Sequence, residues 1–77
     1  MARSSRNWQA HVKGLLKAEL ARRTLSYADL AEKLGEMGIK ENRRNITNRI
    51  GRGNFTAIFF FQCMEAIGAK TIRLEDD

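Results

Sequence analysis

The sequence is poor in the residues that build covalent links, metal centres and catalytic sites. It contains one cysteine, one histidine and no proline. The lone Cys63 excludes an internal disulfide, and together with His11 it makes too small a ligand set for a zinc finger. No neighbouring pair of carboxylates suggests a hydrolytic centre, so we expect no metal, no cofactor and no enzymatic activity.

Long apolar runs are also absent. No stretch approaches the ~20 consecutive apolar residues that span a bilayer, and the first six residues are not followed by the apolar segment of a secretory signal. We therefore expect a cytoplasmic protein that does not enter the membrane. Among the 77 residues, 43% are hydrophobic, which is enough for one core and too few for two.

Positive charge is in excess and is unevenly distributed. The net charge is +5, from 14 Lys and Arg against 9 Asp and Glu. Residues 1–24 hold six basic side chains against Glu19, and residues 40–52 hold five against Glu41, whereas residues 25–39 and 53–77 are each net acidic. A basic surface that serves only solubility does not require this segregation. The pattern favours a polyanionic partner.

Helical periodicity predicts an all-α fold of four to five short helices. Apolar residues recur at spacings of three and four over residues 8–23. A helix over residues 27–34 is expected to begin at the N-cap Ser26, with Asp29 completing a capping box. A strongly apolar segment, residues 55–67, predicts a central core helix that ends at Gly68. Residues 71–74 alternate polar and apolar, which leaves open a short extended segment or a last helical turn.

The helix predicted from Glu41 or Asn42 to Arg52 has a different character. Its aliphatic residues are Ile46 and Ile50, one turn apart, and we expect both to face the core. The opposite arc then carries Glu41, Arg44, Asn45, Asn48 and Arg52, with Thr47 and Arg49 on the flanks. Arginine pairs with guanine and asparagine with adenine in the DNA major groove. The candidates for reading bases are Arg43, Arg44, Asn45, Thr47 and Asn48, and the alternative is an ordinary exposed basic helix.

Two stretches resemble the lambda-repressor and Cro type of helix-turn-helix. They are residues 25–35, LSYADLAEKLG, and residues 50–53, IGRG. In that superfamily a leucine–alanine pair lies on the scaffold helix, and a glycine closes the recognition helix that enters the major groove. The stretch from Gly35 to Ile46 is longer than the tight turn of repressor-type domains. The resemblance therefore implies a helix-turn-helix with an extended turn before the recognition helix.

The chain from Trp8 to Leu74 is also similar to a small bacterial helix-turn-helix-like domain family of unknown function. The stretches that carry this similarity are Gly38-Ile39, Asn45-Ile46, residues 52–55 (RGNF) and residues 66–68 (AIG). This resemblance brings no settled activity. From this resemblance together with the periodicity and charge of the chain, we expect three parts: a flexible basic arm over residues 1–7, a helix-turn-helix domain over residues 8–74 and an acidic tail over residues 75–77.

Further basic residues are candidates for contacts with DNA phosphates. They are Arg3, Arg6, Lys17, Arg22, Lys40, Arg49 and Arg52. Arg3 and Arg6 lie in a segment without periodicity, which we interpret as an arm that reaches phosphates or a minor groove. A tail without a role is the alternative for this segment, and solubility is the alternative for the basic residues of the first helix.

The aromatic run at residues 59–61 predicts a second surface. Successive helical residues are ~100° apart, so three phenylalanines in a row cannot all face one core. Ile58, Phe59 and Phe61 are the candidates for a homodimer interface, which would suit two-fold half-sites on DNA. The alternative is a wide core covered by the chain ends. Trp8 is expected to close the core at one end.

These patterns favour a transcriptional regulator of bacterial or phage type that binds double-stranded DNA with sequence preference. The alternative is a protein-interaction module, such as an adaptor or an antitoxin-like partner, built on the same helical scaffold. Recognition of single-stranded RNA is disfavoured, because the basic helix lacks exposed aromatic side chains on which bases would stack.

Overall fold

The protein is an all-α domain. The computed structural model describes residues 7–72 and residue 74, and over these residues it contains four helices and no strand. They are α1 (Trp8–Arg22), α2 (Tyr27–Glu36), α3 (Arg43–Arg52) and α4 (Ala57–Ala66). The all-α fold expected from the periodicity is confirmed. The expected arm and acidic tail fall mostly outside the described residues, and so do Arg3 and Arg6.

Each helix begins at a polar residue whose side chain accepts a backbone N–H of the first turn. The four N-caps are Asn7, Ser26, Asn42 and Thr56, in extended backbone conformation. Ser26 and Asp29 form the predicted capping box, with Oγ of Ser26 accepting from the Asp29 amide at 3.1 Å and the Asp29 carboxylate accepting from the Ser26 amide at 2.9 Å. These caps satisfy backbone donors that have no partner inside the helix.

The helices end in left-handed turns. Positive φ occurs at Thr24 after α1, Gly38 after α2, Gly53 after α3 and Gly68 after α4. Glycine adopts this conformation without a steric penalty, whereas a β-branched residue such as Thr24 does so rarely. The predicted closures at Gly53 and Gly68 are confirmed. α2 continues to Glu36, two residues beyond the predicted end at residue 34, and Gly38 provides the left-handed turn that follows.

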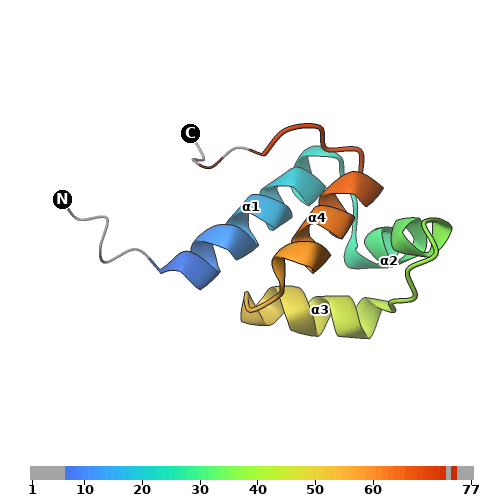
Figure 1. Ribbon diagram of the computed structural model, residues 1–77, viewed down its shortest axis with the longest axis horizontal. Helices are drawn as coiled ribbons and strands as arrows, with labels where there is room; N and C mark the ends of the chain where they lie inside the picture. Colours follow the sequence, from blue (N-terminus) through green and yellow to red (C-terminus); the bar gives the residue numbers. More distant parts are fainter. Residues whose placement is uncertain (1–6, 73, 75–77) are drawn as a thin grey trace.

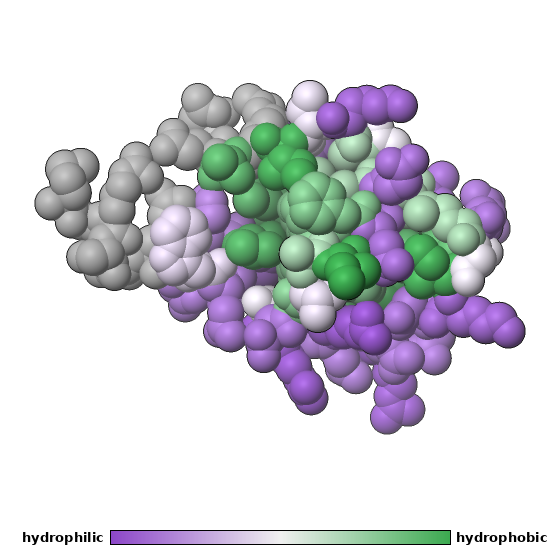
Figure 2. Space-filling model, in the orientation of Figure 1, coloured by the Kyte–Doolittle hydropathy of each residue, from purple (hydrophilic) through white to green (hydrophobic). Residues whose placement is uncertain are grey.

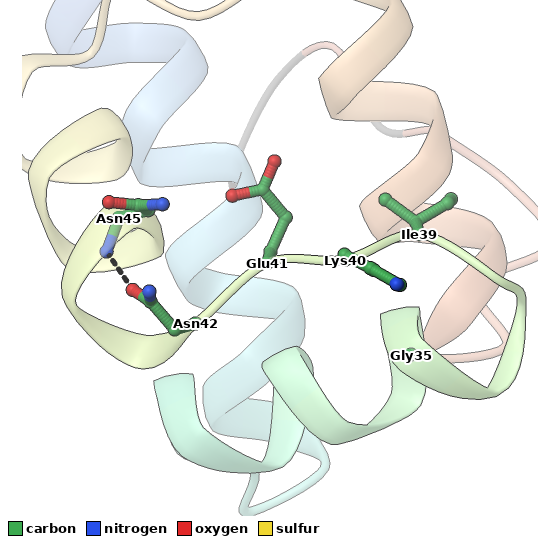
Figure 3. A pocket seen from close by; sticks show the side chains of 6 residues that line it. All are labelled: Gly35, Ile39, Lys40, Glu41, Asn42 and Asn45. Atoms are coloured by element: carbon green, nitrogen blue, oxygen red, sulfur yellow. Dashed lines mark hydrogen bonds between the residues drawn. The ribbon is translucent and has the colours of Figure 1, made fainter.

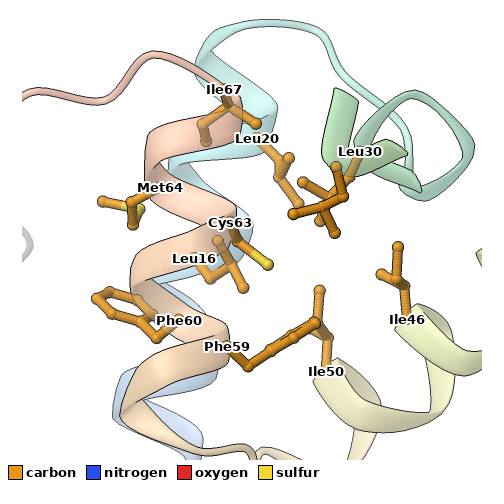
Figure 4. Close-up of a cluster of buried hydrophobic side chains, with 11 residues drawn as sticks. Leu16, Leu20, Leu30, Ile46, Ile50, Phe59, Phe60, Cys63, Met64 and Ile67 are labelled. Atoms are coloured by element: carbon orange, nitrogen blue, oxygen red, sulfur yellow. The ribbon is translucent and has the colours of Figure 1, made fainter. Parts of the chain in front are cut away.

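A single core joins all four helices (Figure 4). The cluster includes Leu16 and Leu20 from α1 and Leu30 and Leu34 from α2. Ile46 and Ile50 point inward from α3 (Figure 4). The core is completed by Phe59, Phe60, Cys63, Met64 and Ile67. Burial of these apolar side chains is the main stabilising term for a domain of this size.

α3 lies along one edge of the molecule (Figure 1). It packs on α2 and on α1, while α4 packs on α2. Residues 37–42 connect α2 to α3, which confirms the extended turn, and Ile39 is half-buried against the core. Nζ of Lys13 in α1 donates to the carbonyl of Gly51 at 3.0 Å and so ties α1 to the last turn of α3.

The two ends of the domain differ from expectation. Trp8 was expected to close the core, but 60% of its surface is exposed, and it meets the His11 ring edge-on with 5.7 Å between centroids. Trp8 lies in the first turn of α1, which extends beyond the ends of α3 and α4 (Figure 1). Beyond α4, neither Ile72 nor Leu74 lies in a helix or a strand, and both are exposed. The Leu74 carbonyl lies 2.7 Å from Nε2 of His11.

Candidate functional site

The candidate site is the outer surface of α3. Its inner side is anchored by Ile46 and Ile50, both fully buried as predicted. Its N-terminus is fixed by Asn42, whose Oδ1 accepts from the Asn45 amide at 2.8 Å, and its C-terminus by Gly53, whose amide donates to the Arg49 and Ile50 carbonyls. Two anchors one turn apart hold a short helix by a narrow stripe, so the rest of its circumference faces outward.

The residues of α3 other than these two isoleucines are exposed. They include four arginines, two asparagines and a threonine, and α3 contains no acid. All five base-reading candidates, Arg43, Arg44, Asn45, Thr47 and Asn48, are therefore brought together on this helix. Because successive residues are ~100° apart, Asn48 is the residue most nearly opposite the two anchors. Figure 2 shows the result as a hydrophilic edge where Figure 1 places α3.

A shallow depression of about 300 Å³ lies between Arg43, Arg44, Thr47 and Asn48. The hydroxyl hydrogen of Thr47 is already used within the helix, because the hydroxyl donates to the Arg43 carbonyl at 2.7 Å. Thr47 can therefore offer an outside partner its methyl group and an acceptor oxygen. The two arginines and Asn48 retain planar donor groups on the exposed side, which is the chemistry that pairs with base edges.

A second depression lies at the start of α3 (Figure 3). It has a volume of about 380 Å³ and is lined by Gly35, Ile39, Lys40, Glu41, Asn42 and Asn45. The side chains of Lys40 and Glu41 point in different directions from the connection between α2 and α3 (Figure 3). Lys40 is exposed, so the structure places this phosphate candidate beside the N-terminus of α3.

Glu41 was expected on the exposed arc of the helix, and this expectation is wrong. It precedes the N-cap, its side chain is only 11% exposed, and its Oε2 lies 3.2 Å from Nη1 of Arg49. Its Oε1 is buried without a hydrogen-bond partner. Arg49 is 46% exposed, and its guanidinium carbon lies 4.9 Å from the centroid of the buried Phe59 ring. This phosphate candidate is thus held between a carboxylate and an aromatic ring.

The remaining phosphate candidates are separated by the fold. Arg52 is exposed at the end of α3, next to the other α3 residues. Lys17 is exposed on α1, and Arg22 lies in the last turn of α1, at the end of the molecule away from α3 (Figure 1). Nη1 of Arg22 donates to Oε2 of Glu19 at 2.7 Å. The structure therefore does not bring Arg22 to the α3 surface.

Glu19 is the centre of a small ion-pair cluster in α1. Besides Arg22, it accepts a hydrogen bond from Nη1 of Arg23 at 2.7 Å. The Arg23 hydrogen bond, and then the charge of Arg22, hold the pKa of the Glu19 carboxyl below its ordinary value, against the opposing effect of burial. Glu19 stabilises the end of α1 and takes no part in the α3 surface.

One of the three predicted dimer-interface residues, Phe59, is buried instead of exposed. Phe59 is 2% exposed and belongs to the core, because it packs beneath Arg49 and beside Phe55. Ile58 and Phe61 are 71% and 57% exposed, as expected for surface residues of α4. Phe61 also lines an apolar groove of about 380 Å³, and Figure 2 shows hydrophobic side chains on one face of the molecule. The groove is lined by Val12, Leu15, Phe55, Thr56, Ala57, Phe60, Phe61, Ile72 and Leu74.

Cys63 lacks the setting of a nucleophile. Its side chain is fully buried, and burial, assisted by the negative charge of Glu41, raises the pKa of the thiol to about 12. Within residues 7–72 and 74, no group of three His, Cys, Asp or Glu side chains is placed to hold a metal ion. None of the described helices is both long and apolar enough to cross a membrane.

Comparison with known proteins identifies a family without indicating a function. Residues 8–72 match a family described as a domain of unknown function, DUF6471. No curated protein and no solved structure matches the chain. The match covers all four helices, so it concerns the whole described fold.

Proposed function

Since the chain belongs to the DUF6471 family, whose description assigns no activity, we propose a function from the site itself: the protein binds double-stranded DNA through α3 in the major groove. The observation that carries the proposal is the exposed face of α3, which contains four arginines and no acid and is anchored by two buried isoleucines. Arg44 and Asn48, far from the anchors, carry the groups that pair with guanine and adenine.

The arrangement of α2 and α3 supports a helix-turn-helix interpretation. α2 begins in a capping box and packs directly on α3, as a scaffold helix must. The connection over residues 37–42 is longer than a tight turn, and it brings Lys40 alongside the first turn of α3. In this proposal the protein is a cytoplasmic regulator of bacterial or phage type, with Arg43, Arg44, Asn45, Thr47 and Asn48 as the candidates for base contacts.

A homodimer is part of the same proposal. An isologous interface needs a surface that complements itself, with projections and a recess on one patch. Ile58 and Phe61 are exposed on α4, three residues apart, and Phe61 lines the apolar groove. Two copies joined through this patch would present two α3 helices to a two-fold DNA site.

The test of DNA binding is selection of sites from a random duplex library at two salt concentrations. We expect one enriched sequence and a negative slope of log K against log salt, because phosphate contacts release condensed counterions. Binding to duplexes without enrichment of a preferred sequence would show that the protein binds DNA only through its net positive charge. A salt slope indistinguishable from zero would exclude the proposal.

Variants of α3, tested on the selected DNA site, identify the residues that contact bases. Arg44→Ala should cost roughly 1 to 3 kcal/mol and relax preference at one base pair, and Arg44→Lys should not restore that preference, because lysine lacks the planar fork. The control is Lys17→Ala on α1, which should weaken binding to all DNA sequences alike. If folded variants of Arg44, Asn45 and Asn48 all keep the wild-type preference, α3 does not read the sequence.

A protein-interaction module is the second candidate function. The observation that favours it is the apolar groove beside Phe61, since an exposed apolar recess is typical of a protein-binding surface. The two functions differ in which face they need. If substitution of Phe61 abolished binding to a protein partner and substitution of Arg44 had no effect on any binding, the interaction module would be favoured over DNA binding.

A further inference from the structure

The second half of α3 borders a depression with a distinct chemistry. It has a volume of about 350 Å³ and is lined by Asn45, Asn48, Arg49, Arg52 and Asn54. Every one of these side chains carries N–H donors, and none is a carboxylate. Two guanidinium groups and three amides around one recess complement a group that accepts hydrogen bonds and carries negative charge.

Arg49 is fixed in this recess before any ligand arrives. Its Nη1 lies 3.2 Å from Oε2 of Glu41, and its guanidinium lies over the buried Phe59 ring, 4.9 Å from the centroid. A guanidinium has five N–H donors, so a single contact with Glu41 leaves donors for a ligand. Because the side chain is already ordered, it loses less rotamer entropy on binding than an unsupported arginine would.

Glu41 supports Arg49 from the protein side. Its side chain is mostly buried, and one of its oxygens lies within the protein without a hydrogen-bond partner. The lining of the recess does not include Glu41, so the carboxylate meets Arg49 without occupying the space for a ligand. The positive charge that faces the recess includes Arg52, which has no carboxylate within ion-pair distance among the described residues.

We propose that this recess binds a single phosphate group, which in the complex is a phosphodiester of the DNA backbone. The proposal rests on the DNA-binding function proposed above and deepens it. It adds Asn54 to the phosphate candidates Arg49 and Arg52, and it leaves base reading to the residues named for it above, of which Arg43, Arg44, Thr47 and Asn48 line the neighbouring recess. Phosphate contacts of this kind fix the position of a recognition helix along the duplex.

The first test uses inorganic phosphate and needs no DNA. Side-chain N–H signals of the arginines and asparagines are followed by NMR during a phosphate titration at constant ionic strength. We expect saturable shifts at Arg49, Arg52 and Asn54, and a loss of affinity of about tenfold in Arg49→Lys, which keeps the charge but loses the fork. The matched control is Arg22→Lys, at an arginine that also has a carboxylate partner but lies on α1 away from the recess, and it should leave phosphate affinity within about twofold of wild type.

Two results of this titration would overturn the site. One is a set of unsaturable shifts that are equal at Arg43, Arg44 and Arg49. The other is an equal loss of affinity in Arg49→Lys and Arg22→Lys. Since Arg49 also contacts Glu41 and Phe59, circular dichroism is used to check that the Arg49→Lys variant is folded. Arg52 is an exposed residue of the same recess, so Arg52→Lys provides a second variant.

The second test locates the phosphate on DNA and separates this proposal from the proposed function. Single methylphosphonates, which are uncharged, replace each backbone phosphate of the selected duplex in turn. We expect one position in each half-site to weaken wild-type binding strongly and Arg49→Lys binding less, because the variant has already lost the guanidinium contacts with that phosphate and keeps only the attraction of the lysine charge and of Arg52. Sequence-selective binding in which no position couples to Arg49 would overturn the recess and keep the function. Saturable phosphate binding without any duplex binding would keep the recess and overturn the function.

Discussion

Gly53 lies against the backbone of Gln9, so closely that a β-carbon added to Gly53 would be 2.8 Å from the Gln9 carbonyl oxygen. Gly53 also has a φ of 65°, in the left-handed region, and its amide closes α3. Two independent constraints therefore require glycine at this position, one from the turn and one from the packing of α1 on the end of α3.

Replacement of Gly53 should be costly, whereas replacement of the nearby Gly51 should not. We expect Gly53→Ala to lower the free energy of unfolding by about 2 kcal/mol, because the backbone conformation and the Gln9 carbonyl both oppose a side chain. Gly51 lies inside α3, and a β-carbon added there would meet nothing within 4 Å, so Gly51→Ala should raise stability by roughly 0.5 to 1 kcal/mol. Urea denaturation of both variants makes the comparison, and equal effects would contradict it.

Thr24 is the only residue other than glycine with positive φ in the described part of the chain. Its amide donates to Ala21 and the Leu25 amide donates to Leu20, a pattern in which glycine is preferred. Since the Thr24 side chain is exposed, Thr24→Gly should raise the free energy of unfolding by about 0.5 to 1 kcal/mol. Thr24→Ala removes the β-branch but keeps a side chain at a positive φ, so it should raise the free energy of unfolding by less than Thr24→Gly does. A loss of stability in Thr24→Gly would show that the hydroxyl or methyl has a stabilising contact.

Glu19 should make stability depend on pH in the acid range. Its pKa is lowered in the folded protein, so its contribution is present above the ordinary value of 4.5 and is lost as the pH falls through the folded pKa. Glu19→Gln should therefore lower stability by about 1 kcal/mol at pH 7 and by much less at pH 3. Denaturation at both pH values tests this, with the exposed Glu32→Gln as control. A difference from wild type that is the same at both pH values would contradict the prediction.

Phe61 and Phe59 should respond differently to a polar substitution. Phe61→Ser, on the exposed face of α4, is expected to leave the fold intact, to give a monomer in sedimentation and to weaken binding to a two-fold DNA site. Phe59→Ser, in the core, is expected to lower the free energy of unfolding by about 3 to 5 kcal/mol. A wild-type protein that remains monomeric when bound to DNA would exclude the dimer.

The features that were predictable from the sequence are those set by local chemistry. The Ser26 and Asp29 capping box, the closures at Gly53 and Gly68 and the inward direction of Ile46 and Ile50 each follow from residues within one or two helical turns. The extended turn was predictable from the spacing between Gly35 and Ile46. All of these depend on short-range hydrogen bonds or helical period.

The features that were missed depend on contacts between distant segments. Glu41 is polar and adjoins a basic stretch, so nothing local signals that its side chain is buried; its burial follows from the path of the connection and from Arg49. The run from Phe59 to Phe61 shows that some ring must be exposed, but which one depends on the rotation of α4 against α2. Trp8 looks like a core residue by type, and only the length of α1 relative to the core places it outside.

The uneven charge of the chain also affects how the protein approaches a polyanion. Residues 25–39, which include α2, are net acidic, while residues 40–52, which include α3, hold five basic side chains against one acid, and that acid is paired with Arg49. Opposite charges on adjacent parts of a small molecule give it an electric dipole. If the protein binds DNA as proposed, the field of the duplex would exert a torque on this dipole and favour orientations in which α3 faces the duplex. At physiological salt this field would extend about 8 Å, so the reorientation would occur in the last step of the encounter and would make productive collisions more frequent without any added contact.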